Sequence, residues 1–547
     1  MATLSDKYRF DDYGLAGALM FLLLGWYFLI RSGDQPLGDF ANYYYAGRML
    51  AEGRFNQDAY DPYQFNKMIS ERTEESVFVN FTPVPPASSV FYLPFSLIRN
   101  PRQAKMLFSF LGLIFFAMVY YRFLRHKDMH RKLPLIFIPL VFYTPLQNNI
   151  LQGQSYLYLL ACLLEGYRQW EKKKPVWAGM LWAVPIALKI YPGILILSLF
   201  FQKGRSVLIA VIGFTALFSL SPFLVTDAAV TTDYFTHILP RLLKGEINDP
   251  FSHFHQSVSA LLNKLLVFDQ HLNPAAGHHK SLLSVGLNWI YQISLLGALL
   301  HLWSGQGSSR FFRFSVSFLG AFLLVSYGST YSLMLLLPLY LALVLMPGVN
   351  NLTRVALILL IAAASNIPIY LLGEMPVLVQ FPRLFAMLGL FFGLVWLIRP
   401  RIEGKVIVFT SLVILFKGLA LDFPRKAEGD YYLKDNRYGI IHSYEFKDRS
   451  LYLRHLNRDG ILESAVPVRD TIWQDADLTT CDNQIYFRNK PITRSPGKKQ
   501  QPCRLNGDEV IFLSDEKRGV GFYTLRRMVL PPIDQVINII APENVPN

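Results

Sequence analysis

An aspartate followed by three tyrosines is the first feature of this chain that could do chemistry. Asp39 stands in the stretch Gly38-Asp39-Phe40-Ala41-Asn42-Tyr43-Tyr44-Tyr45, directly after a Pro-Leu-Gly turn. An aspartate at the start of a helix is a common N-cap. Tyrosine rings stack on sugar rings, and tyrosine is also common at the level of lipid headgroups. The residues alone leave the capping and the chemical interpretation of Asp39 open.

Two cations within apolar stretches are candidates for binding an anion. Lys189 lies at the expected outer end of one apolar helix, and Arg383 lies shortly inside another. A buried cation is costly in a membrane and is therefore often functional. The alternatives are that Lys189 extends toward the interface and that Arg383 pairs with a carbonyl or a carboxylate.

Polar side chains in two further places could contact a ligand. Gln152 and Gln154 flank a glycine at the expected outer start of a helix, where hydrogen bonding between helices is an equal possibility. His255 and Gln256 stand in the second long polar segment. The histidine pairs of this segment have no carboxylate at a useful spacing, so we expect no metal cofactor.

The composition predicts the elements that must position these residues. The 547 residues are 52% hydrophobic and only 17% charged, whereas soluble domains carry about 25% charged residues. This excludes an ordinary soluble globule, and the apolar content excludes a disordered chain. Three cysteines exclude a cysteine-rich disulfide or zinc scaffold. The net charge of +14 lies almost wholly before residue 422, which is typical of cytoplasmic loops and does not indicate a nucleic-acid partner.

Apolar runs predict an all-α membrane domain over 1–421 with about 13 transmembrane helices, since one span needs about 20 apolar residues. The candidate spans are about 14–31, 105–125, 133–148, 150–167, 176–190, 191–201, 206–225, 282–304, 311–328, 331–347, 352–372, 377–398 and 404–421. Lys and Arg follow the even-numbered spans, which places the N-terminus inside. Three polar segments are then expected outside: 32–104, 226–281 and 422–547.

The last segment, 422–547, is expected to form a separate β-rich domain. Apolar and polar residues alternate in runs such as 509–513, and turn residues separate these runs. Cys481 and Cys503 lie in this outer segment, where oxidising conditions favour a disulfide. We expect that disulfide, and two free thiols are the alternative.

Five stretches in chain order make the sequence resemble the GT-C-type membrane glycosyltransferases, and specifically glycosyltransferase family 87. The resemblance covers roughly residues 14–400 and leaves out the C-terminal segment. The stretches are Gly38-Asp39-Phe40 with the tyrosines after it, Phe81-Thr82-Pro83-Val84-Pro85-Pro86, Leu151-Gln152-Gly153-Gln154-Ser155, Ala187-Leu188-Lys189-Ile190-Tyr191-Pro192 and His255-Gln256-Ser257-Val258.

The resemblance implies an inverting transfer of a sugar, with mannose expected, from a polyprenyl-phosphate-sugar donor to a glycan or glycolipid acceptor on the outer face. Asp39 would be the general base that deprotonates the acceptor hydroxyl. The donor phosphate would be bound by Lys189, Arg383 and His255. The residues expected to bind the sugar or the acceptor are Tyr43, Tyr44, Gln152, Gln154, Gln256 and Tyr331.

Two positions depart from the family pattern and leave the sugar and the acceptor open. His255 stands where the matching family segment has an asparagine, and Tyr331 stands about where the family tends to have a histidine. A transporter or flippase of lipid-linked sugars is the alternative function. A transporter favours inverted repeats and charges near the bilayer midplane, whereas the distinctive polar residues here cluster near the expected outer face.

The expected partners are the lipid-linked sugar, the acceptor and membrane lipids. The expected location is the bacterial inner membrane, as a multi-pass protein. Its N-terminus would lie in the cytoplasm and its C-terminal domain in the periplasm.

Overall fold

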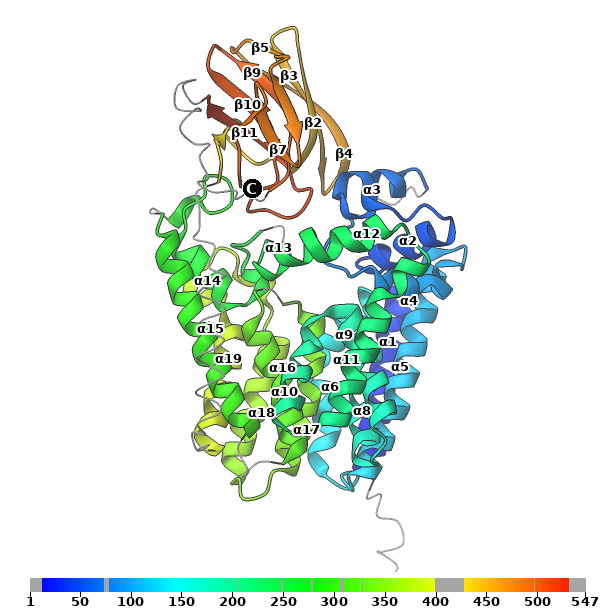
Figure 1. Ribbon diagram of the computed structural model, residues 1–547. Helices are drawn as coiled ribbons and strands as arrows, with labels where there is room; N and C mark the ends of the chain where they lie inside the picture. The colour runs from blue at the N-terminus through cyan, green and yellow to red at the C-terminus, as the bar shows by residue number, and fades with distance from the viewer. Residues whose placement is uncertain are drawn as a thin grey trace, which may run out of the picture.

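The computed structural model describes residues 12–72, 78–202, 204–246, 249–276, 279–304, 309–326, 328–398, 427–495 and 497–530. Helices make up the first part of the chain and strands the last part, and Figure 1 shows the strands as a separate body at one end of the helical bundle. A mostly helical chain with a β-rich C-terminal region agrees with the prediction. The expected span 404–421 and the expected boundary at 421 lie outside the described residues.

The α-helices, in chain order, are α1 (Tyr13–Ser32), α2 (Phe40–Ala51), α3 (Pro62–Ser70), α4 (Ala87–Ser96), α5 (Pro101–His126), α6 (Ile138–Val141), α7 (Tyr143–Leu151), α8 (Tyr156–Glu171), α9 (Pro175–Lys189), α10 (Ile194–Phe201), α11 (Arg205–Leu220), α12 (Ala228–Asp233), α13 (Leu239–Leu243), α14 (Val258–Leu266), α15 (Ser281–Ser304), α16 (Arg310–Leu324), α17 (Leu337–Leu345), α18 (Asn351–Asn366) and α19 (Pro382–Ile398). A 3₁₀ helix, η9 (Thr330–Leu336), precedes α17.

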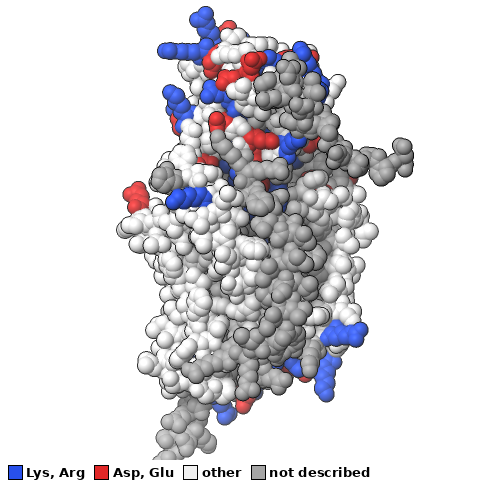
Figure 2. All heavy atoms as spheres, turned by 60° about the vertical axis from the view of Figure 1, so that its left-hand side comes forward, with Lys and Arg blue, Asp and Glu red and all other residues white. Residues whose placement is uncertain are grey.

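Four helices of the described residues are long and apolar enough to cross a membrane. They are Tyr13–Ser32, Pro101–His126, Arg205–Leu224 and Ser281–Ser304. Other apolar helices are shorter, so the prediction of about 13 spans is not confirmed. The expected span 133–148 shows why, because Pro134, Pro139 and Pro145 divide it into short pieces. On the face shown in Figure 2, charged residues gather at the β-rich end and at the opposite end, and the described residues seen in the middle of this face are uncharged.

The helices beneath the candidate site pack closely, and small residues permit this packing. α8 lies against α5 and α9, and α9 lies against α11. A Cβ atom on Gly179 of α9 would collide with Ala210 of α11. The Trp182 indole is fully buried and donates a hydrogen bond to the carbonyl of Leu163 at 2.9 Å. Close helix contact through small residues is typical of membrane bundles, and here it fixes the ends of α8 and α9.

The segment from α2 to α4, which the sequence predicts to lie outside and which we call the first outer segment, forms a second core at one end of the bundle. Phe40, Tyr60 and Phe81 of this segment are buried in one cluster with Tyr234, which follows α12. Two segments far apart in sequence therefore share a core, and Figure 1 shows α12 crossing this end of the bundle beside α2 and α3. This core supports the helix that begins after Asp39.

The described residues of the β domain form three sheets. Its strands are β1 (Asp430–Tyr431), β2 (Ile440–Lys447), β3 (Ser450–Asn457), β4 (Gly460–Pro467), β5 (Ile472–Trp473), β6 (Leu478–Cys481), β7 (Gln484–Phe487), β8 (Lys490–Pro491), β9 (Lys499–Leu505), β10 (Glu509–Ser514) and β11 (Thr524–Val529). The strand orders are β1-β11-β10-β9-β5, β2-β3-β4 and β6-β7-β8, and all pairs are antiparallel.

Strand β10 is the centre of this domain. Its residues Ile511 and Leu513 pack toward the sheet β2-β3-β4, whereas Val510 and Phe512 pack toward β6-β7-β8. Successive side chains of a strand point to opposite faces, so other sheets cover both faces of β10. The prediction of a β-rich C-terminal segment is therefore confirmed. Its central strand β10 is buried on both faces.

The predicted disulfide between Cys481 and Cys503 is wrong, because both thiols are free. Cys481 is exposed at the end of β6, and Cys503 lies in β9, which pairs with β10 in the five-stranded sheet. The two cysteines thus belong to different sheets. Residue types and an expected outer location could not reveal that the two cysteines lie in different sheets.

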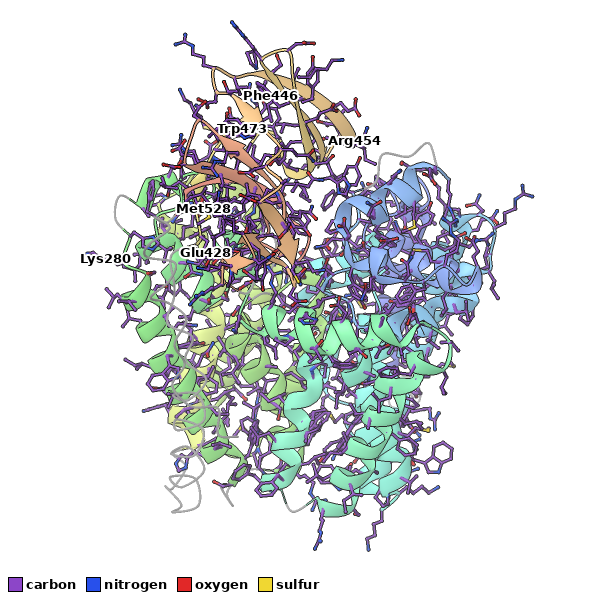
Figure 3. All side chains as sticks on the ribbon, turned by 45° about the horizontal axis from the view of Figure 1, so that its top comes forward. Lys280, Glu428, Phe446, Arg454, Trp473 and Met528 are labelled. Atoms are coloured by element: carbon purple, nitrogen blue, oxygen red, sulfur yellow. The ribbon has the colours of Figure 1, made fainter. Side chains whose placement is uncertain are left out.

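The β domain docks on the outer segments through polar and aromatic contacts. Arg241 of α13 forms a buried ion pair with Asp515, with Nη1 and Oδ2 2.9 Å apart. Tyr63 of α3 stacks on His442 of β2, with ring centroids 3.9 Å apart. Figure 3 shows the domain over the bundle beside the first outer segment, with Arg454 on the side toward that segment.

Candidate active site

Asp39 stands directly before α2 but does not cap this helix. Its side chain makes no capping hydrogen bond, whereas Asp12 and Asp61 cap α1 and α3 in the usual way. Instead, Oδ2 of Asp39 accepts a hydrogen bond from Nε2 of Gln154 at 2.7 Å. The carboxylate is only partly buried. The capping interpretation of Asp39 is therefore wrong, and its charge is directed toward the start of α8.

Four side chains predicted from the sequence form one hydrogen-bonded group, which we call the Asp39 network: Asp39, Tyr43, Gln154 and Lys189. The Tyr43 hydroxyl donates to Oε1 of Gln154 at 2.9 Å. The Lys189 ammonium donates to the Tyr43 hydroxyl at 2.6 Å and to Oε1 of Gln154 at 3.5 Å. A carboxylate and an ammonium thus face the same small region from α2 and from the end of α9.

The proton positions in this network follow from burial. Burial is the main cause that raises the pKa of Tyr43 well above its ordinary value, and Tyr92 and the Asp39 charge act in the same direction. The Tyr43 hydroxyl therefore keeps its proton, donates it to Gln154 and accepts from Lys189. The ring of Tyr43 stacks on Tyr92, with centroids 4.3 Å apart, so its position is fixed.

Two glycine turns hold Asp39 against Gln154. Gly38 and Gly153 both have positive φ angles, +59° and +63°, which side chains disfavour. A Cβ atom on Gly153 would lie 2.6 Å from Cβ of Phe40, and a Cβ on Gly38 would collide with the side chain of Gln152. The backbone N–H of Phe40 donates to the carbonyl of Gln152 at 2.9 Å. The stretch around Gly38 and the stretch around Gly153 therefore pack directly against each other.

Lys189 is positioned by an unusual turn. Ile190, the next residue, has a φ angle of +56°, which is rare and strained for a β-branched residue. The turn ends α9 at Lys189, so the ammonium lies over the rings of Tyr43 and Tyr156, at 5.0 and 5.5 Å from their centroids. Such cation–π contacts favour a charged lysine in a buried place.

Tyr331 also reaches this region, and its role in binding the sugar or the acceptor stays a prediction. Its side chain interacts with the Asp39 carboxylate, and its ring lies 5.3 Å from that of Tyr156. The carbonyl of Tyr331 accepts a hydrogen bond from Nδ2 of Asn149 at 2.9 Å. Our sequence reasoning missed Tyr156, Tyr92 and Asn149. Tyr156 directly follows the Leu151–Ser155 stretch and could have been found by that adjacency, whereas the other two carry no signal in the sequence.

Arg383 and Gln256 meet each other outside the Asp39 network. Oε1 of Gln256 accepts hydrogen bonds from the backbone N–H groups of Arg383 and Leu384, at 3.0 and 3.3 Å. Its Nε2 donates to the carbonyls of His253 and Gln380. All the hydrogen-bonding groups of the Gln256 side chain are thus used within the protein, and they cap the start of α19.

The guanidinium of Arg383 is bound to protein oxygens. Nε and Nη2 donate to the carbonyl of Ile367 at 2.9 and 2.6 Å, and Nη1 donates to the Thr330 hydroxyl at 2.6 Å. The alternative that Arg383 pairs with a carbonyl is therefore what the structure shows. His255 lies nearby, since a Cβ on Gly328 would lie 3.7 Å from its carbonyl oxygen. Burial lowers the pKa of His255, and Asp249 opposes this effect.

Two other predicted residues do not extend into the network. The buried Tyr44 donates to the carbonyls of Ile98 and Arg99, at 2.7 and 3.3 Å, and so points away from Asp39. Gln152 contributes its carbonyl to the glycine contact described above. Within the described ranges, no group of three or more His, Cys, Asp or Glu side chains could hold a metal ion. Metal independence stays a prediction.

Comparison with known proteins identifies one family. Residues 81–326 match the model of glycosyltransferase family 87, a stretch that includes Gln154 and Lys189, begins after Asp39 and ends before Tyr331. Searches of curated proteins and of solved structures gave no match to the chain. The family match, the apolar helices and the order of the motifs agree, and over residues 81–326 the chain resembles the GT-C-type glycosyltransferases of family 87.

Proposed function

We propose that this protein is an inverting glycosyltransferase that moves a sugar, with mannose as the first choice, from a polyprenyl-phosphate donor to a glycan or glycolipid. The reaction would take place on the outer face of a bacterial inner membrane. One observation carries this proposal: the Asp39 carboxylate does not cap its helix, but lies in a hydrogen-bonded network with Lys189. A general base for the acceptor hydroxyl and a cation for the leaving phosphate both favour glycosyl transfer from a lipid phosphate.

Asp39 is the proposed general base. It would accept the proton of the acceptor hydroxyl while that oxygen forms a bond to the anomeric carbon. The bond between this carbon and the phosphate oxygen breaks, and the polyprenyl phosphate leaves with the electron pair. A single displacement inverts the anomeric centre. Gln154 holds Oδ2 of Asp39 at 2.7 Å, and a carboxylate retains further lone pairs for the acceptor hydroxyl.

Lys189 is the proposed partner of the donor phosphate. An ammonium has three N–H donors, and Tyr43 and Gln154 accept two hydrogen bonds from it. The third donor can bind a phosphate oxygen and balance the charge that gathers on the leaving group. Arg383 would act indirectly, because its guanidinium holds Thr330, which directly precedes Tyr331.

Replacement of Asp39 by Asn tests the proposal. Purified enzyme in detergent would be incubated with a panel of polyprenyl-phosphate sugars and candidate acceptors, with release of polyprenyl phosphate as the measurement. Loss of the base should lower turnover at least about 100-fold. Asp34→Asn is the matched control, since Asp34 is exposed in the preceding turn. Full turnover of a well-folded Asp39→Asn variant would contradict the assignment.

The same assay separates an enzyme from a flippase. Detergent micelles provide no second compartment, so a flippase would form no product there. The anomeric configuration of the product, measured by NMR, checks the proposed inversion, and retention would contradict a single displacement.

A further inference from the structure

The loop between β10 and β11 connects the β domain with the core that supports the site. We call residues 515–521 the β10–β11 loop. Asp515 at its start is fully buried and pairs with Arg241 of α13. Val520 near its end is buried in the cluster that also contains Tyr43 and Phe40 of α2. The loop is thus fixed on the outer segments and shares a core with the helix that follows Asp39.

Arg518 of this loop has buried donors that no protein group satisfies. Its Nε and Nη1 atoms are buried, and no described residue accepts a hydrogen bond from either. A buried donor without a hydrogen-bond partner destabilises the folded protein, and more so when it is charged. Native proteins contain few such groups, and each one calls for an explanation. Bound ligands are one such explanation.

The acidic residues around Arg518 are engaged elsewhere. Asp249 and Asp269 are close enough to raise the pKa of Arg518, although burial, the larger effect, lowers it. Asp269 accepts hydrogen bonds from the Tyr431 hydroxyl at 3.0 Å and from the backbone N–H of His271 at 2.9 Å. Asp249 accepts one from a neighbouring backbone N–H. The guanidinium therefore lacks a direct carboxylate partner among the described residues and keeps its positive charge.

The surroundings of Arg518 suit a glycan. Arg518 lines a small hollow at the junction of the β domain and the second outer segment, together with His271, Asn436, Tyr438 and several apolar residues. Asp435 also lines this hollow, and its Oδ2 pairs with Nε of Arg437 at 3.3 Å. Side chains of these types hydrogen-bond to sugar hydroxyls and pack against sugar rings. The hollow lies on the β-domain side of the bundle, whereas a lipid-linked donor would be held at the membrane end of the site.

We propose that Arg518 binds an anionic group, either a carboxylate or a phosphate, of the acceptor glycan. The β domain would thereby hold the acceptor beside the outer segments that position Asp39. This inference rests on the proposed function for the existence of a glycan acceptor. It assigns a role to the β domain that the family resemblance does not cover, since that resemblance ends before the domain begins.

Binding of defined trisaccharides to the full-length protein tests the proposal. Trigalacturonate supplies carboxylates, mannotriose with a 6-phosphate supplies a phosphate, and plain mannotriose is the neutral reference. Calorimetry in detergent would measure their affinities for the wild type, Arg518→Gln, Arg518→Lys and Arg454→Gln. Arg454 is an exposed arginine of the same domain and serves as the matched control. The samples contain no donor, so the result does not depend on whether Asp39 is the base.

We expect the wild type to bind at least one anionic trisaccharide about tenfold more tightly than mannotriose, because hydrogen bonds to charged groups are strong. Arg518→Gln should remove this preference, Arg518→Lys should keep part of it, and Arg454→Gln should keep all of it. The anionic trisaccharide that binds more tightly shows whether the acceptor group is a carboxylate or a phosphate. Equal binding of all three probes by the wild type, or an unchanged preference in Arg518→Gln, would overturn the proposal.

A structural role for Arg518 gives a different result. Thermal unfolding of each variant shows whether the substitution destabilises the protein. If the Arg518→Gln variant does not fold, the test is instead the salt dependence of trisaccharide binding by the wild type. Affinity for the anionic probe should then fall with added salt, while affinity for mannotriose should not, and identical salt dependence would overturn the proposal.

Discussion

Lys189 shows at the scale of single residues how a half-buried cation is available to a ligand. Its ammonium has no carboxylate in direct contact among the described residues, and its bonds go to a hydroxyl and an amide oxygen. Neutral acceptors satisfy its donors without neutralising its charge. Arg383 differs, because a carbonyl and a hydroxyl occupy all three guanidinium nitrogens. Of these two cations, the half-buried Lys189 is a better candidate for binding a phosphate than the buried Arg383.

Lys189→Met should therefore weaken donor binding more than acceptor binding. Methionine keeps much of the length and apolar volume of lysine but has no charge. The loss of a charge-assisted hydrogen bond, about 1.5–3 kcal/mol, should raise the KM for the lipid donor roughly 10- to 100-fold. Steady-state kinetics with each substrate varied in turn is the measurement. Lys174→Met, at the exposed start of α9, is the control. An effect on the acceptor alone would contradict the assignment.

At the scale of elements, the site depends on the contact between the start of α2 and the turn before α8. The contact is made by Gly38 and Gly153, whose backbones approach the facing residues Gln152 and Phe40. Neither helix carries both members of the Asp39–Gln154 hydrogen bond. The geometry of the base is therefore set by the fit of two turns.

Gly153→Ala should disturb this fit and lower turnover. The added Cβ would lie 2.6 Å from Cβ of Phe40, so α2 and the turn must separate. Gly53→Ala is a matched control, because Gly53 also has a positive φ, +66°, and a Cβ there meets nothing within 4 Å. Both substitutions should lower the free energy of unfolding by about 1 kcal/mol, because alanine disfavours a positive φ angle. Thermal unfolding is the measurement. Only Gly153→Ala should also lose most of its activity, and equal activity of the two variants would refute the role of this contact.

At the scale of the whole molecule, the β domain and the helical part form one connected structure. The Arg241–Asp515 pair, the Tyr63–His442 stack and the contact of Val520 with the core of the outer segments join them. Removing one partner of a buried ion pair costs about 3–5 kcal/mol, so this interface contributes to the stability of the site.

The stability of this interface should fall in mild acid. Burial lowers the pKa of His442 from its ordinary value of about 6.5, although the nearby Asp61 carboxylate opposes this effect. The unfolded state then takes up the proton first as the pH falls. The stability that His442 contributes is therefore present above about pH 6.5 and is lost as the pH falls through the folded-state pKa.

His442→Phe should weaken this dependence, since phenylalanine keeps a ring on Tyr63 but does not titrate. Between pH 7.5 and 5, the Tm of the variant should fall by roughly 2 °C less than that of the wild type. His279→Phe, at an exposed position outside the interface, is the control. The same fall in Tm for wild type and His442→Phe would show that His442 is not responsible.

Much of the site could be predicted from residue types and chain order. Asp39, Tyr43, Gln154, Lys189 and Tyr331 were selected from the sequence, and the structure brings them together. Charged and polar residues are rare in apolar segments, so each one carries information. The roles of these residues stay predictions.

Other features could not be predicted, because they depend on contacts between distant segments. Gln256 bonds to the carbonyl of Gln380 and the N–H of Arg383, which lie 124 and 127 residues away. The carbonyl that Arg383 binds lies 16 residues away. Nearly every residue carries the same backbone N–H and C=O groups, so the sequence does not show which of them act as partners. The direction of the Tyr44 side chain, which donates to the distant carbonyl of Ile98, also depends on such a contact. So does the placement of the free Cys481 and Cys503 in different sheets.

The sequence by itself determined the mostly helical, apolar class of this protein, its β-rich C-terminal region and its family resemblance, because composition and alternation act locally along the chain. The tertiary structure alone decided that Asp39 turns away from its own helix toward Gln154, and that the β10–β11 loop reaches the core beneath α2. Both depend on the close approach of segments far apart in the chain. Packing, which acts through space, selects such contacts.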